Sequence, residues 1–512
     1  MPRLRGAGIP HPWLNAQIPP IKVSTAVVLR FSGGPLNRYK VTKQGKDALL
    51  QPVVRLVPPA LCPTSERQVP MLKAAIRASI CTVFLWNVVS AQSADRALVN
   101  LRTFDAVWTV IHETYFDPNF NGIDWNAVRR DLRPKAEAAR TDEELRAIVD
   151  DMLTRLGKSH LTRLPREALE NRSSGDGTVP STGDCGLEVR VLDGQVVVAR
   201  VDPAGPAAGA GVKTGWVLAA VGTEELRPLL QRIPRSGDSR WDALRRWARV
   251  TQLIEGPAGS AVQLTFADGR GRITAVEIER RQNVGERVKL GSLPTFFARL
   301  ESHRLHAGRT AIGVIRFNIW MVPIVRQFDL AIDGLRDADG IVIDLRGNVG
   351  GVAAMLAGLS GHFLNERVAL GTMETRETQL RFSANPRRVS TAGTRVEPFA
   401  GPVAILVDGL TYSASEVFAG GMQSIGRARI FGQQTPGGVL PSAVDRLPNG
   451  DMLEHPIGEF VTATGQHLEG RGVTPDEIVP LTRGDLLAGR DAPLDAAVRW
   501  ISRGSSGKNE PR

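Results

Sequence analysis

One stretch, residues 403–423, constrains the fold more than any other part of this 512-residue chain. The apolar run that begins at Val403 ends at Asp408 and Gly409, which predicts a short buried strand. From Ser413 onward the apolar residues recur at helical spacing. The chain must therefore turn sharply from strand to helix at Ser413. Such a turn lifts the serine hydroxyl above the sheet edge, next to the first free backbone N–H groups of the helix, beginning with Ala414.

The Ser413 turn has two interpretations. Ser413 and Glu416 fit the pattern of a capping box, in which the two residues only close the start of a helix, and most such matches before an apolar run are caps. The alternative is a catalytic turn that supplies a nucleophile and half of an oxyanion hole. The turn alone leaves both interpretations open.

Strand and helix patterns alternate before and after this turn. Apolar runs predict strands at 312–317, 340–346 and 427–432, and helical spacing predicts helices at 324–335 and 352–364. This alternation predicts an α/β fold with a mostly parallel sheet covered on both faces. The loop Gly347-Asn-Val-Gly-Gly lacks the dinucleotide fingerprint and the P-loop lysine. A loop of oxyanion donors suits it better, with the N–H of Gly350 or Gly351 as the second donor.

Residues 71–91 have the pattern of a secretory signal peptide. They begin with Met71, carry two basic residues before an apolar core, and end in Val-Ser-Ala before Gln92. We expect Met71 to be the true start and residues 1–70, which are basic and lack periodicity, to be a non-native upstream extension. A basic arm before a signal anchor is the alternative, but the apolar run is shorter than the ~20 residues that a span needs. The signal predicts export to the periplasm, cell envelope or medium, with no stable membrane span after cleavage.

Removal of residues 1–91 changes the charge of the chain. The full sequence has 64 basic and 53 acidic residues, and the removed segment holds twelve and two of them, which leaves 52 against 51, a net charge of +1. The pI of about 10.0 therefore does not indicate nucleic-acid binding. Cys62 and Cys81 are removed as well, so Cys185 remains alone, which excludes an internal disulfide and a cysteine metal cluster. We expect no metal and no cofactor.

Residues 92–172 are predicted to form a small helical domain. Apolar residues recur at helical spacing around Trp108 and again from Leu145 to Leu156. Ser159 and His160 follow directly after the second of these helices. A lone histidine beside a helix end is usually a surface or capping residue, so His160 indicates catalysis only if the fold supplies a serine for it.

Residues 173–282 form the next predicted unit. Strand patterns at 186–191, 195–201, 262–266 and 273–279, with a Gly- and Ala-rich segment after Pro203, resemble a permuted PDZ domain of bacterial proteases. The resemblance implies a peptide bound as an added strand, with a C-terminal carboxylate held by backbone N–H groups around Cys185, Gly186 and Leu187. The alternative is a small β domain that only spaces its neighbours.

Four motifs, in the same order as in the family, resemble the tail-specific or C-terminal processing peptidases, including the tricorn protease core. The motifs are Asp344-Leu-Arg-Gly-Asn-Val-Gly-Gly, Ser413-Ala-Ser-Glu, Gly426-Arg-Ala-Arg-Ile-Phe-Gly and Glu469-Gly-Arg-Gly-Val-Thr-Pro-Asp. The resemblance covers nearly all of residues 95–500. It implies a crotonase-like (Clp/crotonase superfamily) α/β protease core at 283–500, an N-terminal helical domain and an inserted PDZ-like β domain. We expect residues 501–512 to be a disordered tail.

The chain departs from the family at the general base. The processing peptidases use a Ser-Lys dyad, but the positions that match the lysine and a following glutamine are Gly438 and Ser442. The tricorn-like branch uses a Ser-His pair and a glutamate, which match Ser159, His160 and Glu469. The resemblance therefore assigns Ser413 as nucleophile, His160 as general base and acid, and Ser159 and Glu469 as the groups that orient the imidazole. Gly350 and Ala414 are assigned as the oxyanion donors.

Three functions remain open from the sequence. The first is an exported serine peptidase that acts on proteins or peptides, without nucleic acid as a partner. The second is a catalytically silent relative that binds peptides or hydrophobic ligands. The third is a structural scaffold of the cell envelope. The sequence does not indicate an oligomeric state.

Overall fold

The computed structural model describes residues 95–167, 182–233, 239–289 and 295–506. The expectations for residues 1–70 and for the signal peptide 71–91 lie outside these ranges. Within these ranges, no helix has the length and apolar content that crossing a membrane requires.

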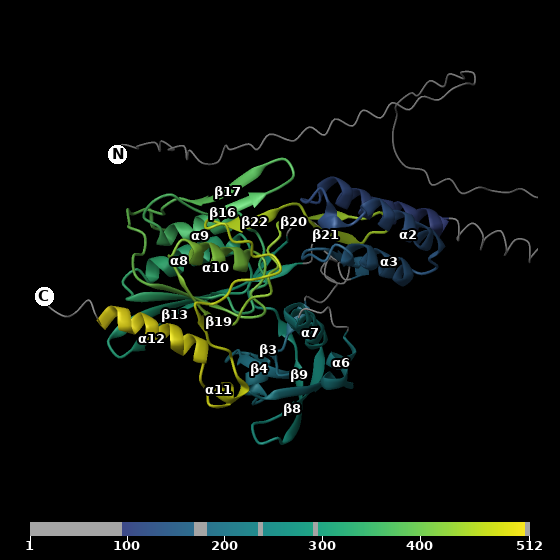
Figure 1. Cartoon of the computed structure of the whole chain (residues 1–512). Coiled ribbons are helices and arrows are strands. Elements are labelled where there is room, and N and C mark those ends of the chain that lie inside the picture. Colours follow the sequence, from purple (N-terminus) through teal and green to yellow (C-terminus); the bar gives the residue numbers. More distant parts are fainter. Residues whose placement is uncertain (1–94, 168–181, 234–238, 290–294, 507–512) are drawn as a thin grey trace, which may run out of the picture. The chain divides into compact units, whose positions relative to one another are not determined.

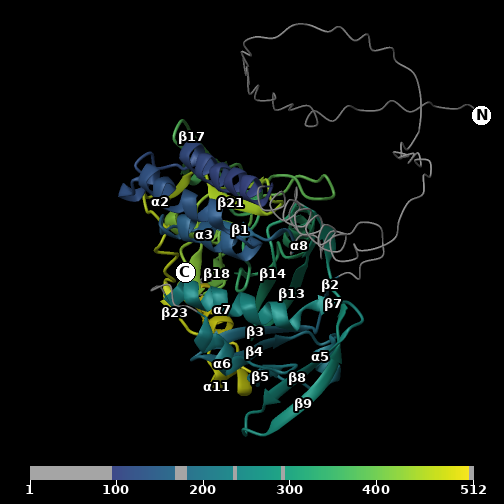
Figure 2. The ribbon, with the colours of Figure 1, turned by 90° about the vertical axis from the view of Figure 1, so that its right-hand side faces the viewer.

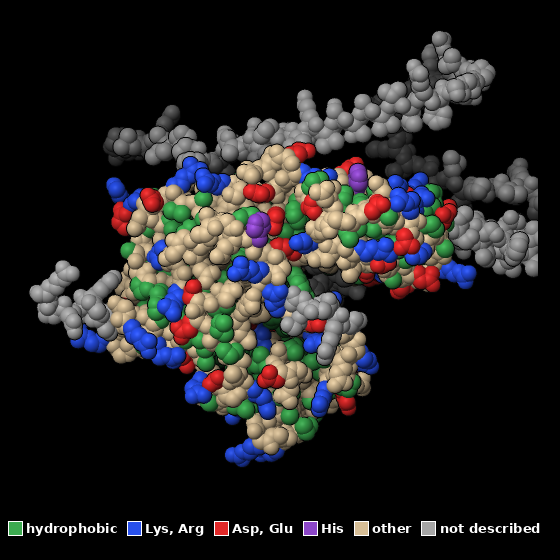
Figure 3. All heavy atoms as spheres, viewed as in Figure 1, with side chains coloured by type: hydrophobic (Ala, Val, Ile, Leu, Met, Phe, Trp, Pro, Cys, Tyr) green, Lys and Arg blue, Asp and Glu red, His purple; other side chains and the backbone are tan. Residues whose placement is uncertain are grey.

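The first part of the described chain is mainly helical (Figure 1). Residues 95–114 form a helix, and the turn η1 (Phe120–Gly122), α2 (Trp125–Ala138) and α3 (Asp142–Thr154) follow it. The predicted start of α3 is confirmed, because the Thr141 hydroxyl accepts the N–H of Glu144 at 3.1 Å. Figure 3 shows basic and acidic side chains interspersed over α2 and α3, where Asp131 pairs with both Lys135 and Arg155.

This helical part ends in a strand that the sequence did not predict. β1 (Thr162–Leu164) pairs antiparallel with β21 (Met452–Pro456), which lies almost 300 residues later in the chain. Figure 2 shows β1 and β21 beside α3, and the side chains of Leu447 and Leu453 complete the core of the helices. The pairing fixes the chain segment that immediately precedes β1.

Residues 182–282 form a β unit with its own core. Its main sheet has the order β3-β4-β5-β8-β9, with β6 beside β5, and a smaller sheet has the order β10-β2-β7. The strands are β2 (Thr182–Asp184), β3 (Leu187–Leu192), β4 (Gln195–Val201), β5 (Val217–Val221), β6 (Glu224–Glu225), β7 (Gly256–Pro257), β8 (Ala261–Ala267), β9 (Ile273–Glu279) and β10 (Arg281–Gln282). The helices are α5 (Pro206–Gly209), α6 (Leu226–Arg232) and α7 (Ser239–Ile254).

The largest sheet contains the strands predicted around the Ser413 turn. Its order is β13 (Leu300–Ala307), β14 (Thr310–Phe317), β15 (Gly340–Asp344), β18 (Val403–Val407), β19 (Arg429–Gly432) and β23 (Glu477–Ile478). β13 is antiparallel to β14, and all other neighbours are parallel. The prediction of a mostly parallel sheet is therefore confirmed.

Helices cover both faces of this sheet (Figure 1). α8 (Pro323–Gly334), α9 (Met355–Ser360) and α10 (Ala414–Ser424) lie on one face, and α12 (Ala492–Ser506) lies on the other. The expected disordered tail from residue 501 is wrong for residues 501–506. α12 continues to Ser506 because Ile501 is completely buried against the sheet, where it packs with Ile312 and Val342.

The remaining elements are short and were not predicted. One sheet has the order β17 (Gln379–Ala384), β16 (Val368–Glu374) and β22 (Glu459–Thr462), and another joins β1, β21 and β20 (Ser442–Arg446). β11 (Glu286–Val288) pairs with β12 (Phe296–Ala298), and η2 (Gly361–Phe363) and α11 (Arg483–Leu487) are single turns.

Candidate active site

Ser413 lies on the strained turn between β18 and α10. Its backbone has φ 56° and ψ −122°, a combination that a non-glycine residue rarely adopts and that costs about 1–3 kcal/mol. All five residues of β18 are buried. Their packing fixes the end of the strand from which the turn begins. The predicted sharp turn from strand to helix is present at this residue.

A buried glutamate holds the turn in place. The carboxylate of Glu416 accepts the Ser413 N–H at 3.1 Å, the Gly438 N–H at 3.0 Å and the Gly437 N–H at 2.7 Å. It also accepts the Thr435 hydroxyl at 2.5 Å. Burial raises the pKa of Glu416 to about 7, and these hydrogen bonds oppose that rise. The Glu416 contact that a capping box predicts is therefore present. It engages the Ser413 N–H and not the Ser413 hydroxyl, so it does not compete with a catalytic use of the turn.

His160 reaches Ser413 from the helical part of the chain. It follows α3, and the β1–β21 pairing two residues later fixes its position against the core. The distance between His160 Nε2 and Ser413 Oγ is 3.2 Å. His160 also has a positive φ of 55°, and its side chain is buried. Both partners of this contact therefore have strained backbones.

A chain of hydrogen bonds continues behind the imidazole. Ser159 Oγ lies 2.8 Å from His160 Nδ1 and donates to Glu469 Oε2 at 2.9 Å, while the Ser159 N–H donates to Oε1 at 2.9 Å. The Val439 N–H donates to the same carboxylate at 3.1 Å. Because the Ser159 hydroxyl proton is directed at the carboxylate, its oxygen accepts the proton of Nδ1. This tautomer leaves Nε2 free to accept the hydroxyl proton of Ser413.

Burial also sets the charge states of this chain. It lowers the pKa of His160 to about 4, so the imidazole is neutral at neutral pH. It raises the pKa of Glu469, and the hydrogen bonds from Ser159 and Val439 oppose that rise. A neutral imidazole aimed at a serine hydroxyl is the form that a general base requires.

The two residues assigned as oxyanion donors differ. The Ala414 N–H has no hydrogen-bond partner within the described ranges, as expected for the first residue of α10. The Gly350 N–H donates to Asn348 Oδ1 at 3.0 Å, which disagrees with its assignment as a free donor. Gly350 has φ 92°, and an added Cβ would lie 2.6 Å from Ser413 Cβ, so only glycine fits there. Among the residues that the structure describes, the Gly351 N–H also has no hydrogen-bond partner.

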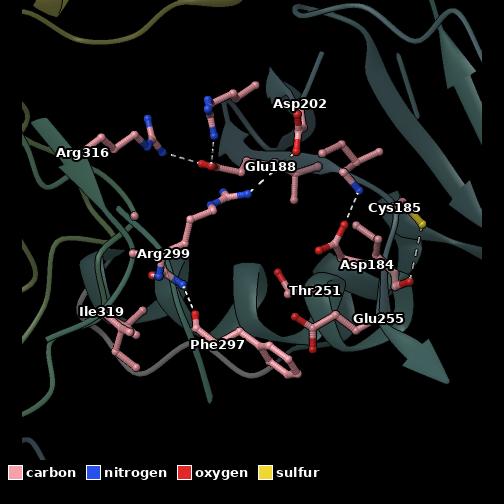
Figure 4. Close-up of a pocket in the computed structure, with 18 of the residues that line it drawn as sticks. Asp184, Cys185, Glu188, Asp202, Thr251, Glu255, Phe297, Arg299, Arg316 and Ile319 are labelled. Atoms are coloured by element: carbon pink, nitrogen blue, oxygen red, sulfur yellow. Dashed lines mark hydrogen bonds and ion pairs between the residues drawn. The ribbon is translucent and has the colours of Figure 1, made fainter. Parts of the chain in front are cut away.

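Cys185, Gly186 and Leu187 are not part of this cluster. They line a separate cavity of about 350 Å³ beside β3 and α7 (Figure 4). The Cys185 thiol is buried and lies 3.9 Å from the carbonyl oxygen of Ile254, and burial raises its pKa to about 11. Among the described residues, no group of His, Cys, Asp and Glu side chains is arranged to hold a metal ion.

Comparison with known families identifies the catalytic domain. Residues 311–479 match the family described as Peptidase family S41, a range that contains Ser413 and Glu469. The chain therefore contains a serine-type peptidase domain of family S41. Residues 101–154 of this S41 peptidase match the Tricorn protease C1 domain, which covers most of the described helical part.

Relatives of this S41 peptidase align with most of its length. A carboxyl-terminal-processing protease of Picosynechococcus sp. is 24% identical over 420 residues, which is 80% of this chain and 91% of the relative. A putative tricorn protease homolog 2 of Streptomyces coelicolor is 26% identical, over 78% of this chain and 32% of the relative. The solved photosystem II D1 C-terminal processing protease has a TM-score of 0.50 at 22% identity, over 77% of this chain and 98% of that protein. This likeness shows a shared fold.

Tyr412 is a neighbour of the site that the sequence analysis missed. Its ring stacks on His160 at a centroid distance of 5.0 Å, and its hydroxyl lies 3.3 Å from Nδ1. Trp241, from α7 of the β unit, meets Tyr412 edge-on at 5.6 Å. A Cβ at Gly438 would overlap the Tyr412 ring and lie 2.6 Å from Trp241. The sequence did contain a signal for this residue, because Tyr412 is one of only three tyrosines in the S41 peptidase and directly precedes Ser413.

Proposed function

We propose that this peptidase cleaves peptide bonds of proteins or peptides with Ser413 as nucleophile and His160 as general base. The observation that carries the proposal is the hydrogen-bonded chain from Ser413 through His160 and Ser159 to Glu469. It supplies the base without which a serine hydroxyl is a weak nucleophile. An intact chain of this kind favours catalysis over a silent, ligand-binding relative.

The proposed reaction has the two halves of acyl transfer. Ser413 Oγ bonds to the carbonyl carbon of the scissile peptide while its proton passes to His160 Nε2. The N–H groups of Ala414 and Gly351 hold the oxyanion, since Gly350 already donates to Asn348. Collapse breaks the C–N bond, and His160 protonates the leaving amine. Water, deprotonated by the same imidazole, then releases the acyl group and regenerates Ser413.

A Ser-Lys dyad does not fit this site. The side chain of a lysine at position 438 would have to occupy the space that the rings of Tyr412 and Trp241 already fill. The Tyr412 ring stacks on the imidazole, so the loss of the lysine and the presence of His160 support each other. We assign the chain to the Ser-His branch on this basis.

The finer features of the fold are also proposed. The core with its mostly parallel sheet supports a crotonase-like architecture for residues 283–500, and the β unit at 173–282 with its terminal strand β3 beside α7 supports a PDZ-like domain. The helical domain is 92–172.

Residues 71–91 direct export, and the relatives with chloroplastic and cyanobacterial names support a location outside the cytoplasm. N-terminal sequencing of exported protein tests this, and Gln92 is the expected first residue.

Hydrolysis of a denatured protein substrate tests the proposed function. The wild type is expected to produce new N-termini that mass spectrometry can map, and Ser413→Ala is expected to produce none above background. Both proteins must show the same thermal transition. Equal cleavage by the two proteins would refute the role of Ser413.

A further inference from the structure

The side chain of Asn348 is completely buried, although it lies in the loop that follows β15. Its Oδ1 accepts the Gly350 N–H at 3.0 Å, and its Nδ2 donates to the carbonyl oxygen of Phe317 at 2.9 Å. A backbone N–H can only donate and a carbonyl oxygen can only accept, so these two partners fix the orientation of the amide. Burial of the amide without them would be costly.

The backbone of Asn348 makes two further hydrogen bonds. Its N–H donates to the carbonyl oxygen of Leu345 at 3.1 Å, and its carbonyl oxygen accepts the Tyr412 N–H at 3.0 Å. Phe317 ends β14, Leu345 follows β15, and Tyr412 lies between β18 and Ser413. These three strands are neighbours in the sheet. Asn348 therefore joins the carboxyl ends of three adjacent strands beside the nucleophile.

The two glycines after Asn348 depend on such bonds for their conformation. Gly350 and Gly351 have φ of 92° and 138°, and glycine has many alternatives to these values. The Gly350 carbonyl oxygen accepts the Trp320 N–H at 2.8 Å. In a trans peptide bond the N–H and the carbonyl point in opposite directions, so the Gly351 N–H points away from Trp320. The Asn348 amide fixes the preceding peptide through the Gly350 N–H.

This pair of glycines lies at the nucleophile. A Cβ added at Gly350 would lie 2.6 Å from Ser413 Cβ and 3.0 Å from the backbone nitrogen of Ala414, the first oxyanion donor. Among the described residues, the Gly351 N–H has no hydrogen-bond partner. The amide of Asn348 cannot itself reach a substrate, because it is buried and both its ends are bonded. Any effect of Asn348 on the reaction therefore passes through its neighbours.

We propose that Asn348 is a positioning residue for catalysis: its amide holds Gly350 so that the Gly351 N–H meets the oxyanion, and its carbonyl oxygen holds the turn that carries Ser413. The inference rests on the proposed function and adds a residue to it. Because the oxyanion exists only in the transition state and the tetrahedral intermediate, Asn348 acts on kcat and not on the binding of uncleaved substrate.

The variant Asn348→Asp tests this inference through its pH dependence. An ionised aspartate still accepts the Gly350 N–H but has no proton for the carbonyl oxygen of Phe317, so at pH ~8 kcat should be about 10²-fold below that of the wild type. A protonated carboxyl group donates and accepts in the same pattern as the amide, and burial raises the pKa of a carboxyl group. At pH ~5 the deficit should therefore shrink to about tenfold or less.

The comparison with the wild type is made at each pH. The ratio of the two kcat values removes the titrations that both proteins share, including those of His160 and Glu416. Asn100→Asp is the matched control, because Asn100 is also buried and its Nδ2 also donates to a carbonyl oxygen at 2.9 Å, that of Ala139 in the helical part. This variant should lower the thermal transition and leave kcat unchanged.

Binding measurements separate positioning from substrate recognition. In the Ser413→Ala background, Asn348→Asp should leave the Kd of an uncleaved fluorescent peptide within about twofold of its value without the substitution. In protein that retains Ser413, inhibition by a peptide boronic acid, which forms a tetrahedral adduct with an active-site serine, should weaken in parallel with kcat/KM.

Two uncharged variants apply if Asn348→Asp does not fold at pH ~8. Asn348→Ser keeps a hydroxyl that can accept the Gly350 N–H, whereas Asn348→Ala keeps no acceptor. The kcat values should fall in the order wild type, Asn348→Ser, Asn348→Ala, with unchanged peptide binding.

The outcomes distinguish the inference from the proposed function. Wild-type kcat in the Asn348 variants, a deficit in Asn348→Asp that does not shrink at pH ~5, an equal deficit in Asn100→Asp, or a deficit that lies in peptide binding would each overturn the role of Asn348 alone. Hydrolysis that persists in Ser413→Ala would overturn the proposed function and this inference with it.

Discussion

At the scale of single residues, backbone strain marks the site. Five non-glycine residues of the described chain have positive φ, and they include both Ser413 and His160. Asparagine, aspartate and histidine adopt a positive φ more readily than other side chains do, whereas serine is not among these types. The cost, about 1–3 kcal/mol at each residue, is offset by the buried surroundings and is expected where a fixed side-chain direction is needed.

Replacement of His160 tests the general base. His160→Ala removes the acceptor 3.2 Å from Ser413 Oγ, so kcat should fall by about 10³-fold or more. The matched control is His303→Ala on the exposed part of β13, which should retain wild-type kcat. Steady-state hydrolysis of a short peptide measures both. Wild-type kcat in His160→Ala would rule out the Ser-His assignment.

The pH dependence should reflect the burial of His160. An unperturbed imidazole has a pKa near ~6.5, whereas burial lowers the pKa of His160 to about 4. The base is active when neutral, so kcat/KM should stay high down to pH ~5 and fall as the pH drops through about 4.

The same shift affects the free energy of unfolding. His160 binds its proton more readily in the unfolded chain, so stability is also lost as the pH falls from ~6.5 to about 4. Thermal transitions at each pH separate the two effects, and an acid limb at pH ~6.5 in folded protein would contradict the burial argument.

The space at Gly438 gives a steric test. Gly438→Ala places a Cβ against Tyr412, whose ring stacks on the imidazole, and against Trp241, which contacts Tyr412 edge-on. Displacement of His160 by about 1 Å should lower kcat by about 10²-fold. Gly358→Ala in α9 is the control, because its added Cβ meets nothing within 4 Å. Kinetics of the two variants decide the point: equal kcat values would show that the rings do not position the base.

At the scale of elements, two long-range connections build the site. Glu416 ties the first turn of α10 to the segment Thr435–Gly438, and β1 holds the segment after α3 against β21. The sequence predicted α10 and α3 from apolar spacing and capping residues, since those signals are local. It missed β1, because a strand of three residues has no periodicity and its partner is distant in the sequence.

Glu416→Gln tests the first connection. The amide group would turn N–H donors toward at least one of the four donors that the carboxylate accepts, which should cost about 1–3 kcal/mol of stability and lower kcat. The pKa of Glu416 is raised to about 7 in the folded state, so the wild type loses stability as the pH rises from about 4.5 through 7. The wild type should therefore exceed Glu416→Gln, in which residue 416 does not titrate, by a larger free energy of unfolding at pH ~5 than at pH ~8. Denaturant titrations at both values measure this, and an unchanged difference would show that Glu416 does not titrate in this range.

At the scale of the whole molecule, parts distant in sequence meet at one site. Trp241 and Arg240 of α7 belong to the β unit, yet Trp241 contacts Tyr412 and Arg240 bonds the carbonyl oxygens of Gly470 and Arg471 at 2.6 Å. The motifs predicted Ser413, His160, Ser159 and Glu469 as candidates, because a family resemblance carries residue identities. They could not predict these contacts, which arise only when the chain is folded, nor the hydrogen bond that engages Gly350.

These contacts also change how the β unit must be studied. Because the unit is distant from Ser413 in sequence, its deletion is expected to affect only substrate recruitment. The structure shows that deletion would also remove the contact of Trp241 with Tyr412 and the hydrogen bonds from Arg240 to the carbonyl oxygens of Gly470 and Arg471. Point substitutions in the cavity that Cys185, Gly186 and Leu187 line are therefore the appropriate test of recruitment.

The central claim is that His160 activates Ser413, and active-site labelling tests it most directly. Full-length protein is treated with a fluorophosphonate at pH 7, and the modified residue is identified by peptide mass spectrometry. We predict one label on Ser413 in the wild type and in His303→Ala, and a large loss of labelling in His160→Ala. Equal labelling of Ser413 without His160, or a label on a different serine, would contradict the account.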